Sequence, residues 1–273
     1  MEVRMTDMAH RAAENLAAVR EKRPLVHNIT NYVVMNYTAN ALLACGASPV
    51  MAHAADEVAE MVSLAGALVI NIGTLSEAWV RSMLMAAHHA AEQGTPIVLD
   101  PVGAGATRFR TEAAKRILAV AGIRVLRGNP SEILSLQDAG SRTKGVDSLH
   151  GVDAAAEAAL GLAVDLNTTL AITGPVDLVT DGEREVRVSN GHPLLSRVTG
   201  TGCTATALIG AFMAVEPDGV RAAAAALAYF GLAAERAAQN TAGPGSFMIA
   251  LLDALYHLTP EELRDGCRIE VVR

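Results

Sequence analysis

Short apolar runs of strand length alternate along this chain with segments long enough to form helices. Four such runs, each next to a helix-length segment, are Ala67–Ile72, Ile97–Leu99, Arg124–Leu126 and Thr169–Ile172. Strands that alternate with helices form a mostly parallel sheet whose two faces are both covered. The sequence therefore predicts an α/β fold in three layers, with the sheet between two layers of helices.

The two ends of the chain depart from this alternation. Apolar residues at three- and four-residue spacing predict a helix over Met5–Lys22, and Pro24 stops it. Asp181-Gly182 separates Leu178–Thr180 from Glu185–Ser189, which is a hairpin signal. After that hairpin, the pattern predicts three closing helices, over Ala205–Val215, Val220–Gln239 and Ser246–His257. Helix starts are expected at Asp56, Thr111 and Pro260.

Composition limits the class of protein. With 51% apolar and 3% aromatic residues, we expect helices that pack on the sheet through small side chains. No break in composition marks a linker, so one domain over residues 1–273 is expected. A net charge of −7 and no Lys/Arg run argue against nucleic acid as a partner.

Other features argue against a membrane or secreted protein. The uncharged stretch Gly200–Val215 contains Gly, Thr and Cys and stops short of the roughly 20 residues of a membrane span, and the N-terminus does not resemble a signal peptide. The three cysteines are widely spaced and form no CxxC pair, which argues against a disulfide framework and a zinc site. We therefore expect a cytoplasmic protein.

A glycine-spaced loop, Gly200-Thr201-Gly202, opens directly onto an apolar helix at Cys203. Glycines let the backbone turn its N–H groups towards one point, and a helix N-terminus adds partial positive charge there. The loop can hold an anion such as a phosphate. A tight turn before a buried helix would show the same pattern, so the loop alone does not decide between them.

Polar residues at the ends of three other predicted strands support phosphate chemistry. Asn129 and Glu132 lie three residues apart, beyond a strand end, where open α/β sheets bind ligands. They can hold water and Mg²⁺, although the same residues also form a common helix start. Asp100 ends another strand before a Gly-rich segment, and Thr173 ends a fourth.

The chain lacks the GxxxxGK[ST] phosphate loop and the dinucleotide fingerprint GxGxxG. Six motifs instead occur together in one order. They are His27-Asn28-Ile29-Thr30-Asn31, Gly46-Ala47-Ser48-Pro49-Val50-Met51, Asn71-Ile72-Gly73-Thr74, Asp100-Pro101-Val102-Gly103-Ala104-Gly105-Ala106, Arg127-Gly128-Asn129 and Gly200-Thr201-Gly202-Cys203. Taken together, from about residue 24 to 250, they resemble the hydroxyethylthiazole kinase family.

This resemblance implies a ribokinase-like fold and a homotrimer with sites between subunits. It also implies that ATP phosphorylates the alcohol of 4-methyl-5-(2-hydroxyethyl)thiazole. The residues implied to contact the thiazole are Met51, Gly200 and Asn31. Those implied to contact ATP are Arg127 and Thr173, with Gly200, Thr201 and Gly202 around the transferred phosphate. Asp100 and Glu132 are implied to serve Mg²⁺, directly or through water.

Cys203 is implied as the catalytic residue, because the position after the turn carries a proton-accepting Asp in most ribokinase-like enzymes. A helix N-terminus lowers a thiol pKa, whereas nearby phosphates raise it, so we expect a modest proton acceptor. Cys45 and Cys267 are interpreted as ordinary small residues. His27 is expected to orient its loop rather than to act as an acid or base.

Three alternatives stay open. One is a related enzyme of the same fold, a hydroxymethylpyrimidine kinase or a nicotinamide-hydrate dehydratase, which would usually carry Asp at position 203. A second is a thiol enzyme with Cys203 as nucleophile and the Gly-Thr-Gly turn as oxyanion hole. A third is a ligand sensor that keeps the pocket without turnover.

Overall fold

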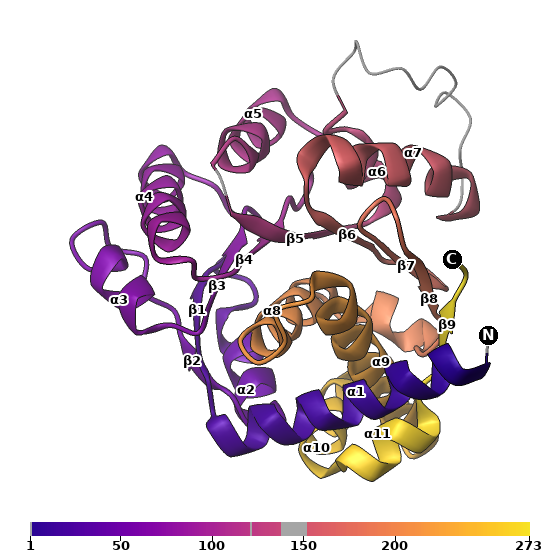
Figure 1. The fold of residues 1–273 in the computed structure, drawn as a ribbon. Coiled ribbons are helices and arrows are strands. Elements are labelled where there is room, and N and C mark those ends of the chain that lie inside the picture. Colours follow the sequence, from indigo (N-terminus) through magenta and orange to yellow (C-terminus); the bar gives the residue numbers. More distant parts are fainter. Residues whose placement is uncertain (1, 121, 138–151) are drawn as a thin grey trace.

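A computed structural model describes residues 2–120, 122–137 and 152–273 of the chain (Figure 1). Within these residues, nine strands form one sheet in the order β2-β1-β3-β4-β5-β6-β7-β8-β9. The strands are β1 Leu25–Ile29, β2 Ser48–Val50, β3 Ala67–Asn71, β4 Ile97–Asp100, β5 Ile123–Gly128, β6 Thr169–Ile172, β7 Asp177–Thr180, β8 Glu185–Val188 and β9 Ile269–Val271. Neighbours among β1–β6 pair parallel, and β7, β8 and β9 continue the sheet antiparallel.

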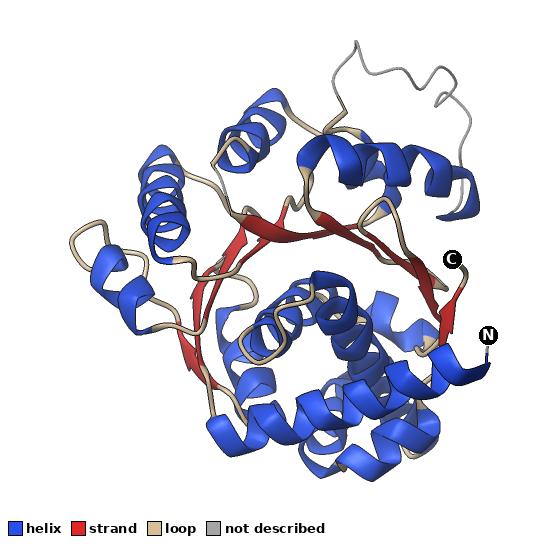
Figure 2. Ribbon diagram, in the orientation of Figure 1, coloured by secondary structure: helices blue, strands red, loops and turns tan. Residues whose placement is uncertain are grey.

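Helices cover both faces of the sheet (Figure 2). On one face lie α3 Val58–Leu64, α4 Glu77–Gln93, α5 Arg108–Leu118, α6 Pro130–Leu134 and α7 Val152–Leu166. On the other lie α1 Glu2–Lys22, α2 Met35–Cys45, α8 Thr201–Met213, α9 Gly219–Gln239, α10 Pro244–His257 and α11 Pro260–Gly266. The predicted three-layer architecture is confirmed, as are the four predicted strands and the hairpin.

Successive strand residues point to opposite faces and so divide the core in two. In β3, Leu68 and Ile70 pack under α3 and α4, whereas Val69 faces α8. The residue facing α8 is the smaller one, and Gly210 of α8 lies so close that an added Cβ would meet Val69 Cγ2 at 2.5 Å. Small residues on both sides therefore set the close packing of α8 that the composition predicts.

Some local predictions were wrong. The chain closes with four helices rather than three, since α11 follows the Pro260 start, and the short strand β9 ends it. The N-cap of α5 is Thr107, whose side chain accepts from the Arg110 N–H, while the Thr111 hydroxyl accepts from Gly105 N. Helix α3 has Glu57, not Asp56, at its N-cap and has no side-chain cap. Residue types that favour N-cap positions occur at neighbouring places in the chain, so the sequence alone does not show which residue is the N-cap.

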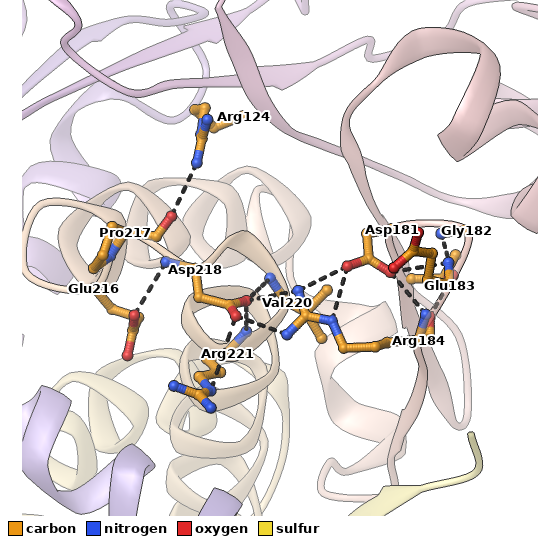
Figure 3. A network of polar contacts seen from close by, with 11 residues as sticks. Arg124, Asp181, Gly182, Glu183, Arg184, Glu216, Pro217, Asp218, Val220 and Arg221 are labelled. Atoms are coloured by element: carbon orange, nitrogen blue, oxygen red, sulfur yellow. Dashed lines mark hydrogen bonds and ion pairs between the residues drawn. The ribbon is translucent and has the colours of Figure 1, made fainter.

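At the amino-terminal edge of the central strands, a polar network fastens the hairpin to α9 (Figure 3). Arg184 donates to both carboxylate oxygens of Asp218, at 2.7 and 3.1 Å, and to Asp181. Asp218 also caps α9 by accepting from the N–H groups of Val220 and Arg221. Burial alone would raise the pKa of Asp218, but hydrogen bonds and positive charge, chiefly from Arg184, favour the charged carboxylate and hold the pKa below its ordinary value. The network lies at one edge of the sheet, so a site can form at the opposite edge, where the parallel strands have their carboxyl ends.

Candidate active site

The residues that the sequence analysis singled out line the carboxyl edge of the parallel strands. Asp100 is the last residue of β4 and Arg127 the next to last of β5, while Asn31, Met51 and Thr173 lie one or two residues beyond β1, β2 and β6. The chain runs from β1 outward to β2 and then back across to β3, so the strand order reverses beside β1. Ligands of open α/β sheets bind in the crevice at such a reversal.

The Gly-rich loop meets this edge from α8. Gly200 has a left-handed φ of +85°, and a Cβ there would lie 2.5 Å from Val34 Cγ1, so the turn requires glycine. The Thr201 hydroxyl donates to the Leu195 carbonyl at 2.8 Å and fixes the approach to the helix. The first N–H groups of α8 have no acceptor within the helix. The start of α8 can therefore hold an anion, as the loop predicts.

Arg127 lies directly over this loop. A Cβ on Gly202 would meet Arg127 Nη1 at 2.6 Å, so only glycine admits the guanidinium there. Arg127 Nη2 donates to the Thr173 hydroxyl at 2.5 Å, and Nη1 lies 3.6 Å from Asp100 Oδ2. This arrangement joins the predicted phosphate-binding residues into one cationic group beside the helix start.

Asp100 is fully buried and has one free oxygen. Its Oδ2 accepts from Asn71 Nδ2 at 2.9 Å and from the Thr206 hydroxyl at 2.7 Å. Its Oδ1 has no hydrogen-bond partner among the described residues. Burial raises the pKa of Asp100 to about 6, opposed by the positive charge of Arg127. A buried carboxylate oxygen without a partner is costly unless a ligand completes it.

Glu132 is held differently. Its Oε1 accepts from Gly103 N and its Oε2 from Asn129 N, both at 2.9 Å. The Asn129 side chain accepts in return from Glu132 N, which completes a capping box at the start of α6. The helix-start interpretation of Asn129 and Glu132 therefore holds. Each Glu132 oxygen keeps a further lone pair that can accept from water.

Cys203 lies in the first turn of α8 beside Asn31. Asn31 Nδ2 donates to Asn71 Oδ1 at 2.8 Å and approaches Cys203 Sγ at 3.5 Å. Burial raises the pKa of the Cys203 thiol to about 11, and the negative charge of Asp100 adds to the rise. The thiol is therefore protonated at neutral pH, and the lowering that a helix N-terminus gives is overcome by burial.

Met51 lies at the far end of the row, beyond the edge strand β2, and is half-buried. The next residue, Ala52, accepts a hydrogen bond at 2.8 Å from Nε2 of the buried His27. Burial lowers the pKa of His27, so its ring is neutral. His27 thus holds the loop after β2, whereas its own loop was the one expected.

A cavity of about 570 Å³ opens on the other side of Arg127. Arg127, Thr173 and Gly202 line one end, and apolar side chains of Pro175, Leu227 and Phe230 line another part. A cavity of this size suits a nucleotide-sized ligand whose charged part lies at the Arg127 end.

A family model for the hydroxyethylthiazole kinase family matches residues 16–261. The chain belongs to this family. A hydroxyethylthiazole kinase from Desulfotalea psychrophila is 63% identical over 97% of each chain, and one from Moorella thermoacetica is 56% identical over 93% of this chain and 95% of that one. The predicted family and the predicted enzyme class are confirmed.

Solved structures agree with the fold. The structure of a hydroxyethylthiazole kinase protein from Pyrococcus horikoshii has a TM-score of 0.89 at 51% identity, covering 96% of this chain and 99% of that one. A ribokinase-like superfamily protein from Enterococcus faecalis has a TM-score of 0.64 at 13% identity, covering 93% and 95%. The predicted ribokinase-like fold is confirmed. No helix in the described part of the chain is both long and apolar enough to cross a membrane.

The sequence analysis missed two groups of residues at this edge. Leu227 and Phe230 line the cavity, but they lie three apart on an apolar stretch of α9, which indicates core packing. Arg110 of α5 donates to the carbonyls of Ile72, Val102 and Gly73 and so ties the loops after β3 and β4 together. A charged residue at a helix start gives no signal for such a contact.

Proposed function

We propose that this chain uses ATP to phosphorylate the hydroxyl group of 4-methyl-5-(2-hydroxyethyl)thiazole. The observation that carries the proposal is the position of Arg127 and Gly202. Both line the 570 Å³ cavity, and both adjoin the cluster of Asn31, Cys203 and Asp100, because Arg127 Nη1 lies 3.6 Å from Asp100 Oδ2 and Gly202 precedes Cys203 in the chain. Two substrates bound in the cavity and at the cluster would meet at the start of α8, which is the geometry of a group transfer.

ATP would bind with its base in the cavity and its phosphates against Arg127 and Thr173. The backbone N–H groups of Gly200, Thr201 and Gly202 would then surround the phosphoryl group in flight, helped by the partial positive charge of α8. Phosphoryl transfer passes through a loose transition state whose charge lies on the peripheral oxygens. Fixed donors around those oxygens are therefore the main contribution expected of the chain.

The alcohol would lie against Met51, Asn31 and Gly200, with its hydroxyl beside Cys203. A thiol with a raised pKa is protonated at pH 7, so Cys203 would accept a hydrogen bond from the alcohol rather than its proton, and the proton would pass to an oxygen of the transferred phosphoryl group. Orienting the hydroxyl suffices, because a loose transition state needs little proton removal beforehand. Cys203→Ala should lower kcat by up to about 100-fold, the size expected for lost positioning of the hydroxyl, with the KM for ATP unchanged, and unaltered turnover would remove Cys203 from catalysis.

Mg²⁺ fits beside Asp100, whose buried Oδ1 has no protein partner among the described residues. Glu132 would serve the ion through water, since backbone N–H groups already occupy both its oxygens. The described residues hold no group of three His, Cys, Asp or Glu that could bind a metal by themselves. Phosphate oxygens of ATP would supply the remaining ligands, and the ion would neutralise charge on the transferred group.

A homotrimer with sites between subunits is part of the proposal. Large apolar side chains are exposed next to Asn31 and on the helices beside it, at Tyr32, Val33, Leu43 and Ile249. The Tyr37 hydroxyl donates to the Met248 carbonyl and joins α2 to α10 there. An apolar surface beside the alcohol site supports a partner subunit at that place. The expected compartment is the cytoplasm.

The deciding experiment is a coupled assay of ADP release with the thiazole alcohol, ATP and Mg²⁺. We expect turnover that needs all three components. The same assay with hydroxymethylpyrimidine tests the related kinase, and turnover of the pyrimidine alone would overturn the substrate. A covalent acyl adduct on Cys203 in mass spectrometry would favour the thiol enzyme, and ligand binding without ADP release would favour the sensor.

A further inference from the structure

Asn71 is a buried side chain to which neither the motifs nor the proposed mechanism assign a role. It is the last residue of β3 and is 1% exposed. Its Oδ1 accepts from Asn31 Nδ2 at 2.8 Å and from Gly73 N at 3.0 Å, and its Nδ2 donates to Asp100 Oδ2 at 2.9 Å. The side chain thus contacts both the alcohol end and the metal end of the site.

The direction of these hydrogen bonds is fixed. The backbone N–H of Gly73 can only donate and the Asp100 carboxylate can only accept, so the Asn71 amide has one orientation that satisfies both. Asn31 can reach this amide only because residue 73 is glycine, since a Cβ there would lie 2.6 Å from Asn31 Nδ2. Asn31 in turn approaches Cys203 Sγ. A continuous polar chain therefore runs from Cys203 through Asn31 and Asn71 to Asp100.

We propose that Asn71 couples the two substrate sites of the kinase, so that bound magnesium nucleotide and bound alcohol tighten each other through its amide. This inference rests on the proposed function. An alcohol that contacts Asn31 would order the Asn31 amide, and through Asn71 it would hold Asp100 with its Oδ1 towards the nucleotide. Each ligand would then bind to residues that the other has already ordered, which gives positive coupling. Asn71 is a positioning residue, because it acts through Asn31 and Asp100.

Thr206 offers a matched control. Its hydroxyl proton is directed at the same Asp100 Oδ2, at 2.7 Å, and its alternative acceptor is the Gly202 carbonyl of its own helix at 3.2 Å. Thr206 therefore holds Asp100 without reaching Asn31. Thr206→Val removes this donor to Asp100 and keeps the shape of the side chain, and it leaves the contact between Asn31 and Asn71 intact.

The test is the affinity for the thiazole alcohol, measured by titration calorimetry with and without Mg²⁺ and a non-hydrolysable ATP analogue. In the wild-type protein we expect the analogue to raise the affinity for the alcohol by about 5-fold or more, a usual size for coupling between sites. In Asn71→Ala and Asn71→Leu this factor should fall towards one, while Thr206→Val should retain it. Thermodynamic linkage requires that the alcohol raise the affinity for the analogue by the same factor. Measuring both affinities therefore checks each value against the other.

Asn71→Leu covers the case in which the cavity left by the smaller variant prevents folding. It keeps the approximate volume of the side chain and removes both the acceptor for Asn31 and Gly73 and the donor to Asp100, without adding a charge beside Asp100. Full coupling in Asn71→Leu, equal loss in Thr206→Val, or no coupling in the wild-type protein would each overturn the role of Asn71. ADP release by the wild-type protein is scored separately, so a failure of the proposed function is told apart from a failure of this inference.

Discussion

At the scale of single residues, the site depends on what burial does to two acidic groups. Cys203 and Asp100 lie at opposite ends of the chain of amides through Asn31 and Asn71. Burial raises the pKa of both groups, because it disfavours their charged forms. The chain therefore keeps a neutral thiol beside the proposed alcohol, and a carboxylate that is costly to leave without a ligand.

The raised pKa of Cys203 predicts how its alkylation depends on pH. Because the thiolate is the reactive form and the pKa is about 11, the rate with iodoacetamide should rise about 10-fold per pH unit up to pH 10. Peptide mapping by mass spectrometry measures Cys203 separately from Cys45 and Cys267. The Cys203→Ala variant identifies the labelled peptide. A plateau below pH 9 would contradict the raised pKa.

Asp100→Asn should gain stability relative to the wild-type protein as pH rises, while lowering activity. The pKa of Asp100 rises from 3.8 to about 6 on folding, so the wild-type protein loses stability as pH rises from about 4 to 6. Asn stays neutral, so the stability difference between the two proteins should change over that range by about 3 kcal/mol in favour of the variant. Unfolding in denaturant without Mg²⁺ at pH 4, 5, 6 and 7 measures it. A difference that shrinks with pH would contradict the assignment.

At the scale of elements, α8 decides the geometry of the site, because it carries the loop and Cys203. It lies close to the sheet through Gly210, which faces Val69 and Val26. A helix further from the sheet would move the start of α8 away from Arg127. Close packing of small residues is therefore a requirement of the site as well as of the core.

The same substitution should have opposite effects in two helices. Gly210→Ala puts a Cβ 2.5 Å from Val69 Cγ2 and should destabilise the protein by about 1–3 kcal/mol. Gly161→Ala in α7, where a Cβ meets nothing within 4 Å, should stabilise it by about 0.5–1 kcal/mol through helix propensity. Urea unfolding measures both. Equal effects would show that propensity, not space, governs Gly210.

At the scale of the whole molecule, all nine described strands belong to one sheet. The predicted single domain over residues 1–273 stays a prediction. It implies one cooperative unfolding transition, because a continuous sheet cannot lose part of its core without exposing the rest. Differential scanning calorimetry should show a single peak whose calorimetric and van't Hoff enthalpies agree within each oligomeric state. Two resolved peaks would divide the chain into separate units.

The proposed trimer predicts a mass near 85 kDa, about three times the 28.4 kDa of one chain. Ile249→Glu, at an exposed apolar residue of α10, should dissociate it by placing a charge in the interface. Val164→Glu serves as control, because Val164 is equally exposed but lies in α7 on the other face. Light scattering coupled to size exclusion measures the masses. A wild-type monomer would remove the trimer from the proposal.

Some candidate site residues could be identified from the sequence alone, and others could not. Asp100, Thr173 and the 200–203 turn were singled out because each lies at the end of a strand or the start of a helix, and such ends meet at one edge of an α/β sheet. Arg127 was named only through the resemblance to the family. The contact between Thr206 and Asp100 was not found, because it joins residues 106 positions apart. Leu227 and Phe230 were not found, because apolar residues that line a cavity look like core residues.

From the sequence alone came the alternation of strands and helices, the family and the edge at which the candidate site lies. Those properties follow from local periodicity and from motifs that neighbouring residues carry. The tertiary structure decided the direction of the Cys203 pKa shift, the free oxygen of Asp100 and the bridge that Asn71 makes. Burial and hydrogen bonding depend on residues from distant parts of the chain, and only the fold brings these together.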